Sequence, residues 1–94
     1  MNVRELMTIL ADADPENLVL VSGYEGGYTT VAAASVRPMQ QLDRGDDWNG
    51  AWETPEVAAE QISPPKPGSW REMLAPPTLV GGPVVALVIS RSGR

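Results

Sequence analysis

The chain of 94 residues contains no cysteine, no histidine and no phenylalanine. The absence of cysteine excludes disulfides, thiolate nucleophiles and thiolate metal sites, and the absence of histidine excludes imidazole bases and the commonest zinc ligand. Without phenylalanine, the apolar side chains are mainly Val, Leu, Ile, Met and Ala, so we expect a thin core. Because most catalytic arrangements are excluded, we predict a non-enzymatic protein without a metal or another cofactor.

Basic residues and long apolar runs are also scarce. Seven basic and twelve acidic residues give a net charge of −5, which disfavours binding to duplex nucleic acid or to an anionic membrane. The longest apolar run, Val84–Ile89, is too short to span a bilayer, and Arg4 and Glu5 stand where the apolar core of a signal peptide would lie. We therefore expect a soluble protein of the cytoplasm, where the lack of cysteine fits a reducing environment.

Two local patterns predict the first structural elements. Asn2 followed by Glu5 has the spacing of a helix capping box, so we expect a helix that begins at Val3 and ends near Asp12, ahead of Pro15. A second pattern, from Val19 to Val31, predicts a β-hairpin. Its Gly26-Gly27 step supplies the positive φ angles of a tight turn, and the second strand should run from Thr29 to Val36, before Pro38.

Two segments, Leu18–Val21 and Val84–Ile89, are apolar at every position rather than at alternate ones. Strands of this kind are usually covered on both faces. One short helix can cover only one face of a small sheet, so the other face must be covered by the middle of the chain or by a second copy. We therefore predict a homo-oligomer, most simply a two-fold dimer.

The middle of the chain, residues 38–83, holds most of the prolines and all three tryptophans. We predict a single domain over residues 1–94 in which 38–83 is an irregular insertion. Within it, Thr54 and Pro55 should begin a short helix through Glu60, followed by a polyproline-like spacer at Ser63–Gly68 and one helical turn at Ser69–Leu74. The acidic run at Asp43–Gly50 departs from the EF-hand spacing, so we expect a solvated loop there.

These elements together predict an α+β fold. One N-terminal helix packs on a small, mainly antiparallel sheet of three strands, and the long Pro- and Trp-rich insertion precedes the last strand.

The candidate ligand-binding residues are aromatic, glycine and arginine residues. Exposed aromatic rings can stack on a nucleotide base or fill a pocket of a partner protein, glycine-rich turns can present backbone amides to an anion, and arginines can bind a phosphate. The alternatives are a purely structural hairpin, tryptophans that anchor the insertion to the core, and arginines that are ordinary surface charges. The candidates are Tyr24, Glu25, Gly26, Gly27, Tyr28, Arg37, Trp48, Trp52, Trp70, Arg71 and Arg91.

The N-terminal pattern Val3-x-Glu5-Leu6-x-x-x-Leu10, with Pro15-x-x-x-Val19-x-Val21 and the hairpin Gly23-Tyr24-Glu25-Gly26-Gly27-Tyr28, resembles small uncharacterised accessory proteins of phages and prophages. The resemblance covers about the first third of the chain and the last apolar strand, and it does not include the insertion. It implies a viral accessory protein that acts in the host cytoplasm and counteracts bacterial defence. Our first hypothesis is that the protein sequesters a small nucleotide-like signal molecule. The alternative is an inhibitor of a host defence protein complex that acts through the acidic, Trp-rich insertion.

Overall fold

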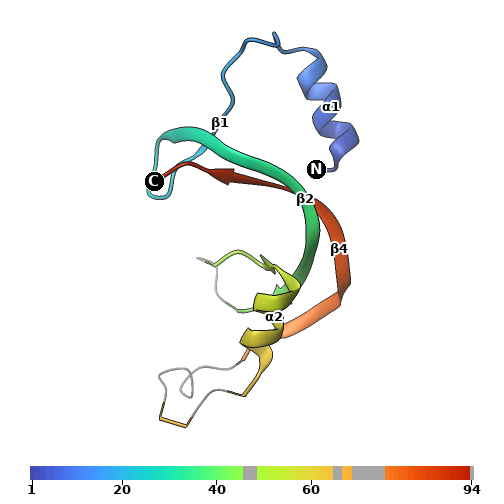
Figure 1. Ribbon diagram of the computed structural model, residues 1–94, viewed down its shortest axis with the longest axis vertical. Coiled ribbons are helices and arrows are strands. Elements are labelled where there is room, and N and C mark those ends of the chain that lie inside the picture. The colour runs from blue at the N-terminus through green and yellow to red at the C-terminus, as the bar shows by residue number, and fades with distance from the viewer. Residues whose placement is uncertain (46–48, 65–66, 69–75, 94) are drawn as a thin grey trace. The chain divides into compact units, whose positions relative to one another are not determined.

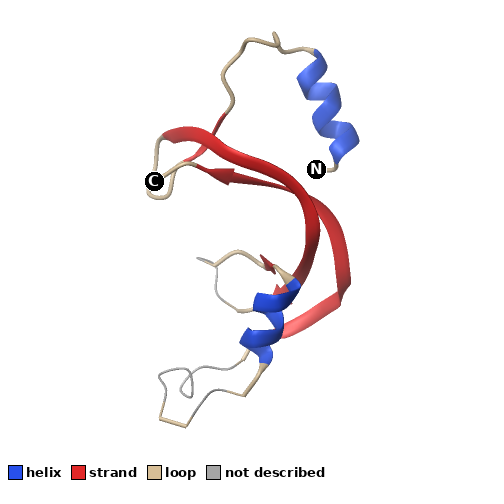
Figure 2. Ribbon diagram, in the orientation of Figure 1, coloured by secondary structure: helices blue, strands red, loops and turns tan. Residues whose placement is uncertain are grey.

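The computed structural model describes residues 1–45, 49–64, 67–68 and 76–93 (Figure 1). Its elements are, in chain order, α1 (Val3–Ala11), β1 (Leu20–Ser22), β2 (Tyr28–Asp43), β3 (Trp52–Glu53), α2 (Pro55–Ile62) and β4 (Thr78–Arg91) (Figure 2). The predicted α+β class is confirmed. The sheet has four strands rather than the three that we expected, because β1, β3 and β4 all pair with β2.

The contacts divide the chain into two compact units. Unit 1 comprises Met1–Val36 and Leu87–Arg94, and unit 2 comprises Arg37–Ala86. Helix α1, strand β1 and the hairpin therefore belong to unit 1, whereas β3 and α2 belong to unit 2. The long strands β2 and β4 contribute residues to both.

Helix α1 begins where the capping pattern predicts. The side chain of Asn2 accepts a hydrogen bond from the backbone N–H of Glu5 at 2.8 Å, which satisfies one of the free amides of the first turn. The helix ends at Ala11, and the following turn is closed by hydrogen bonds between Asp14 and Asn17. The expected packing of α1 on the sheet is not observed, since none of its residues is buried.

Strand β2 continues past Pro38, where we expected it to end. The pairing with β3 begins only at Gln40, and the pairing with β1 ends at Thr30. Pro38 therefore lies between these two paired stretches, so its missing N–H removes no hydrogen bond from the pairing of β2 with β1 or with β3. A strand tolerates proline at such a position.

The segment 38–83 is largely regular over its described residues, which differs from the irregular insertion that we expected. It includes the ends of β2 and β4, strand β3 and helix α2. The predicted start of α2 is confirmed: the Thr54 hydroxyl accepts from the N–H of Val57 at 3.3 Å, and Pro55 is the first helical residue. Most of the predicted spacer at 63–68 is described and contains no helix or strand. The helical turn expected at 69–74 lies outside the described residues.

The buried residues of the described chain all lie in unit 2. They are the apolar Leu42 and Ala58 and the polar Gln40, whose side-chain amide donates to the carbonyls of Val80 and Gly81 at 3.3 and 3.1 Å. No described residue of unit 1 is buried. The described residues thus do not provide the coverage of both faces that we expected for Leu18–Val21 and Val84–Ile89, because most residues of β1 and β4 are exposed.

Candidate binding surface at the hairpin tip

The hairpin of unit 1 forms as its sequence predicts. Val21 is paired with Thr29, and Ser22 with Tyr28, before the chain turns. The N–H of Gly23 donates to the carbonyl of Gly27 at 3.0 Å and closes the turn.

Two glycines give this turn its shape. The φ angles of Gly26 and Gly27 are 131° and 63°, in a region that side chains with a Cβ rarely adopt. A Cβ built at either position would meet no atom within 4 Å. Backbone conformation, rather than crowding, therefore requires glycine here.

The two tyrosines of the turn are exposed to solvent. Tyr24 is 61 % and Tyr28 is 76 % exposed, and Glu25, Gly26 and Gly27 between them are exposed as well. Large aromatic side chains normally gain stability by burial, so two such rings at one turn form a surface that can contribute strongly to the binding of another molecule.

The end of β4 adds an arginine to this surface. In Figure 1 the C-terminal end of β4 lies beside the turn between β1 and β2. The guanidinium carbon of Arg91 lies 5.5 Å from the centre of the Tyr24 ring, within the range of a cation–π interaction. The Nε of Arg91 donates to the carbonyl of Gly93 at 3.3 Å. We call Tyr24, Tyr28 and Arg91 the tip surface.

Hydroxyl groups hold the end of β4 against the hairpin. The Thr29 hydroxyl donates to the carbonyl of Ser92 at 2.8 Å, the Ser92 N–H donates to the carbonyl of Thr30 at 2.8 Å, and the Ser92 hydroxyl donates to the same carbonyl at 3.0 Å. The hydroxyls of Thr30 and Ser92 are also hydrogen-bonded to each other. Because Ser92 follows Arg91 directly, these bonds fix the backbone that carries the guanidinium beside Tyr24.

The structure brings together only some of the residues that the sequence suggested. Tyr24, Glu25, Gly26, Gly27, Tyr28 and Arg91 all belong to unit 1 and lie at or beside the turn. Arg37, which is exposed, and Trp52, which is 44 % exposed, belong to unit 2. Trp48, Trp70 and Arg71 lie outside the described residues.

Sequence reasoning missed a polar cluster in unit 2. We expected the arginines to be either phosphate ligands or surface charges, but the side chain of Arg44 is only 5 % exposed. Its Nη2 lies 2.8 Å from Glu53 Oε2 and donates to Gln61 Oε1 at 2.9 Å, and Gln61 in turn donates to Glu53 at 3.3 Å. We call Arg44, Glu53 and Gln61 the polar node. No short sequence motif indicates the polar node, because its residues come from three different parts of the chain.

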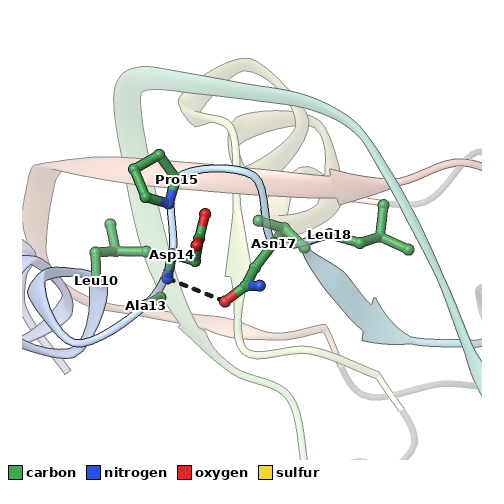
Figure 3. Close-up of a pocket in the computed structure, with 7 residues that line it drawn as sticks. Leu10, Ala13, Asp14, Pro15, Asn17 and Leu18 are labelled. Atoms are coloured by element: carbon green, nitrogen blue, oxygen red, sulfur yellow. Dashed lines mark hydrogen bonds between the residues drawn. The ribbon is translucent and has the colours of Figure 1, made fainter.

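A shallow apolar depression lies between α1 and β1 in unit 1 (Figure 3). It is open to solvent and has a volume of about 360 Å³. The backbone N–H of Asp14 donates to the side chain of Asn17 at 3.0 Å across the turn that forms one wall. Its lining residues are Leu10, Ala13, Asp14, Pro15, Asn17, Leu18 and Val19.

Acidic clusters and long apolar helices are absent from the described residues. Among them, no three acidic side chains are grouped closely enough to hold a metal ion. None of their helices has the length and apolar character needed to cross a bilayer. The tip surface itself offers aromatic stacking, apolar contact and the positive charge of Arg91.

Comparison of the chain with protein-family models, with curated proteins and with solved structures found no match.

Proposed function

We propose that this chain is a non-enzymatic binding protein that attaches to another protein through the tip surface. The observation that carries the proposal is the exposure of Tyr24 and Tyr28 on one tight turn, with the Arg91 guanidinium beside the Tyr24 ring. Tyrosine and arginine are the residue types most enriched, together with tryptophan, among the residues that dominate protein interfaces.

The arrangement also favours a protein over a small molecule as the partner. Small ligands usually bind in concave sites that bury most of their surface. The rings of the tip are 61 % and 76 % exposed, so they are better suited to enter a pocket on a partner than to enclose a ligand. The turn is closed by the hydrogen bond between Gly23 and Gly27, and the Ser92 hydrogen bonds hold the end of β4 beside it. Such preorganisation reduces the entropy that is lost on binding.

The resemblance to phage accessory proteins supports the choice of partner class. We propose a component of a bacterial defence system, bound in the host cytoplasm and blocked by stoichiometric association. Trp52, at 44 % exposed, supports a separate contact that is formed by the insertion.

Sequestration of a nucleotide-like molecule is the second candidate. It is favoured by the Arg91 guanidinium beside the Tyr24 ring, because a base can stack on an exposed tyrosine of the turn and a phosphate can pair with an arginine. This mode also requires no catalysis.

One experiment separates the two candidates. The parent chain and a Tyr24→Ala/Tyr28→Ala variant are immobilised and exposed to host lysate, with Glu60→Ala, an exposed residue of α2, as a control for a surface change outside the tip. A protein retained by the parent and the control but not by the tyrosine variant, and bound again after purification, supports the proposal. In parallel, a panel of mono-, di- and cyclic nucleotides is titrated calorimetrically. Micromolar binding that is lost in Tyr28→Ala and Arg91→Ala would replace our proposal by the second candidate, and turnover of a nucleotide would contradict both.

A further inference from the structure

Helix α1 carries an unpartnered apolar stripe. Val3, Met7 and Leu10 are 53 %, 64 % and 52 % exposed, although they lie on one face of the helix at the i, i+4, i+7 spacing of a helix–helix seam. Short helices are stabilised mainly by packing of such a face. As no described residue of unit 1 is buried, this part of the chain lacks a core of its own.

The charges at the two ends of α1 differ. Arg4 and Glu5 both lie in the first turn, whereas Asp12, Asp14 and Glu16 lie at and beyond the C-terminal end, and the last turn contains no basic residue. At 3.6 residues per turn, Arg4 borders the stripe beside Met7, whereas Glu5 lies on the opposite side of the helix. Acidic groups at a helix C-terminus and a basic group at the N-terminus each interact unfavourably with the helix dipole. A second α1 that lies antiparallel to the first relieves both unfavourable interactions, because it brings its own Arg4 to the acidic end of the first helix.

The apolar depression provides a further surface that a second, antiparallel copy of α1 could cover. It begins at Leu10 and continues through Ala13, Pro15 and Leu18, directly beyond the C-terminal end of the stripe. In an antiparallel pair centred on Met7, the N-terminal turn of the second copy extends over this end. An exposed apolar side chain there, Val3, then faces an open apolar surface.

We propose that two copies of this chain associate through α1, antiparallel about a two-fold axis at Met7. The stripe of each copy packs on the stripe of the other, Arg4 of each faces the acidic end of its partner, and the depression of each receives the N-terminal turn of the other. The tip surface takes no part, so the proposal is independent of the proposed function.

The absence of native cysteine allows a direct test. A disulfide requires Cβ atoms about 3.5–4.5 Å apart, so oxidised Met7→Cys should form a linked dimer on the order of ten times faster than Thr8→Cys. Thr8 is the matched control, because it is exposed and lies about 100° around the helix from Met7, outside the stripe. Light scattering coupled to size exclusion should give twice the chain mass of 10.1 kDa for the parent.

Charged substitutions test the seam without a covalent bond. Met7→Glu should shift the parent dimer to a monomer, with circular dichroism to check that the fold is retained, whereas Thr8→Glu should remain a dimer. Arg4→Glu should weaken association, and Arg4→Glu combined with Asp14→Lys should restore it. A parent that is monomeric at the highest soluble concentration, a Thr8→Cys that links as fast as Met7→Cys, or a Met7→Glu that remains a dimer would each overturn the proposal.

Discussion

The polar node allows a sharp prediction about stability. Arg44 follows β2, Glu53 lies in β3 and Gln61 lies in α2, so one guanidinium connects three parts of unit 2. The Arg44 side chain is almost completely removed from solvent, whereas the Glu53 side chain is 30 % exposed. Replacing Arg44 by alanine therefore leaves a carboxylate that water can reach only in part.

The expected loss in the free energy of unfolding lies between the values known for buried and for exposed ion pairs. Removal of one partner of a fully buried ion pair costs about 3–5 kcal/mol, whereas exposed pairs contribute about 0–1 kcal/mol. Because Glu53 is partly hydrated, we expect Arg44→Ala to lower the free energy of unfolding by about 2–3 kcal/mol. Replacing both partners by methionine removes the charges together, so this double variant should lose about 1 kcal/mol less than Arg44→Ala alone.

Urea unfolding followed by circular dichroism and tryptophan fluorescence measures these differences, at one protein concentration for all variants. Arg37→Ala is the control, because Arg37 is an exposed arginine of the same unit, and we expect it to change stability by less than about 0.5 kcal/mol. The reasoning is refuted if Arg44→Ala is as mild as Arg37→Ala. It is also refuted if the double methionine variant is at least as unstable as the single one, because the unpaired carboxylate would then not be the cause of the loss.

Three further changes test local features of the fold. Gly27→Val should lower the thermal midpoint, at a cost of about 1–2 kcal/mol for a β-branched residue at a φ of 63°, whereas Gly50→Val, where φ is not positive, should leave it nearly unchanged. Thr54→Ala should cost about 1 kcal/mol through loss of the α2 cap, and Thr54→Ser should retain most of it; equal losses in urea unfolding would contradict the capping role. Gln40→Leu should cost about 1–2 kcal/mol, because two carbonyls of β4 lose a buried donor, and an unchanged urea midpoint would show that these bonds contribute nothing.

The features that the sequence predicted depend on residues a few positions apart. The start of α1 follows from Asn2 and the backbone of Glu5, and the start of α2 follows from Thr54 and Pro55. The hairpin follows in the same way from the glycines of its turn. In each case the residue types themselves provide the hydrogen bond or the backbone angle, so no knowledge of distant contacts is needed.

The features that the sequence did not predict depend on residues far apart. Pro38 indicated the end of a strand, but whether its missing N–H matters depends on where β1 and β3 pair. The burial of Arg44 depends on Glu53 and Gln61, which no short motif connects to it.

The residues of the candidate site also divide into those that a local motif predicts and those whose position depends on distant contacts. The exposed turn with Tyr24 and Tyr28 could be predicted from one motif. Arg91 could be named as a candidate from its type alone, but its position beside the Tyr24 ring depends on the pairing of β4 with β2, which brings Ser92 to Thr30. Long-range pairing of this kind has no counterpart in the local sequence.

The central claim is stoichiometric binding through the tip surface, and a binding isotherm tests it most directly. The protein captured from host lysate is purified and titrated calorimetrically with the parent, with Tyr28→Ala, with Arg91→Ala and with the Glu60→Ala control. We predict saturation at a fixed ratio for the parent and the control, and an affinity at least about tenfold lower for both tip variants, since interface residues of this kind contribute more than about 1.4 kcal/mol. Equal affinity of folded tip variants and parent would contradict the account.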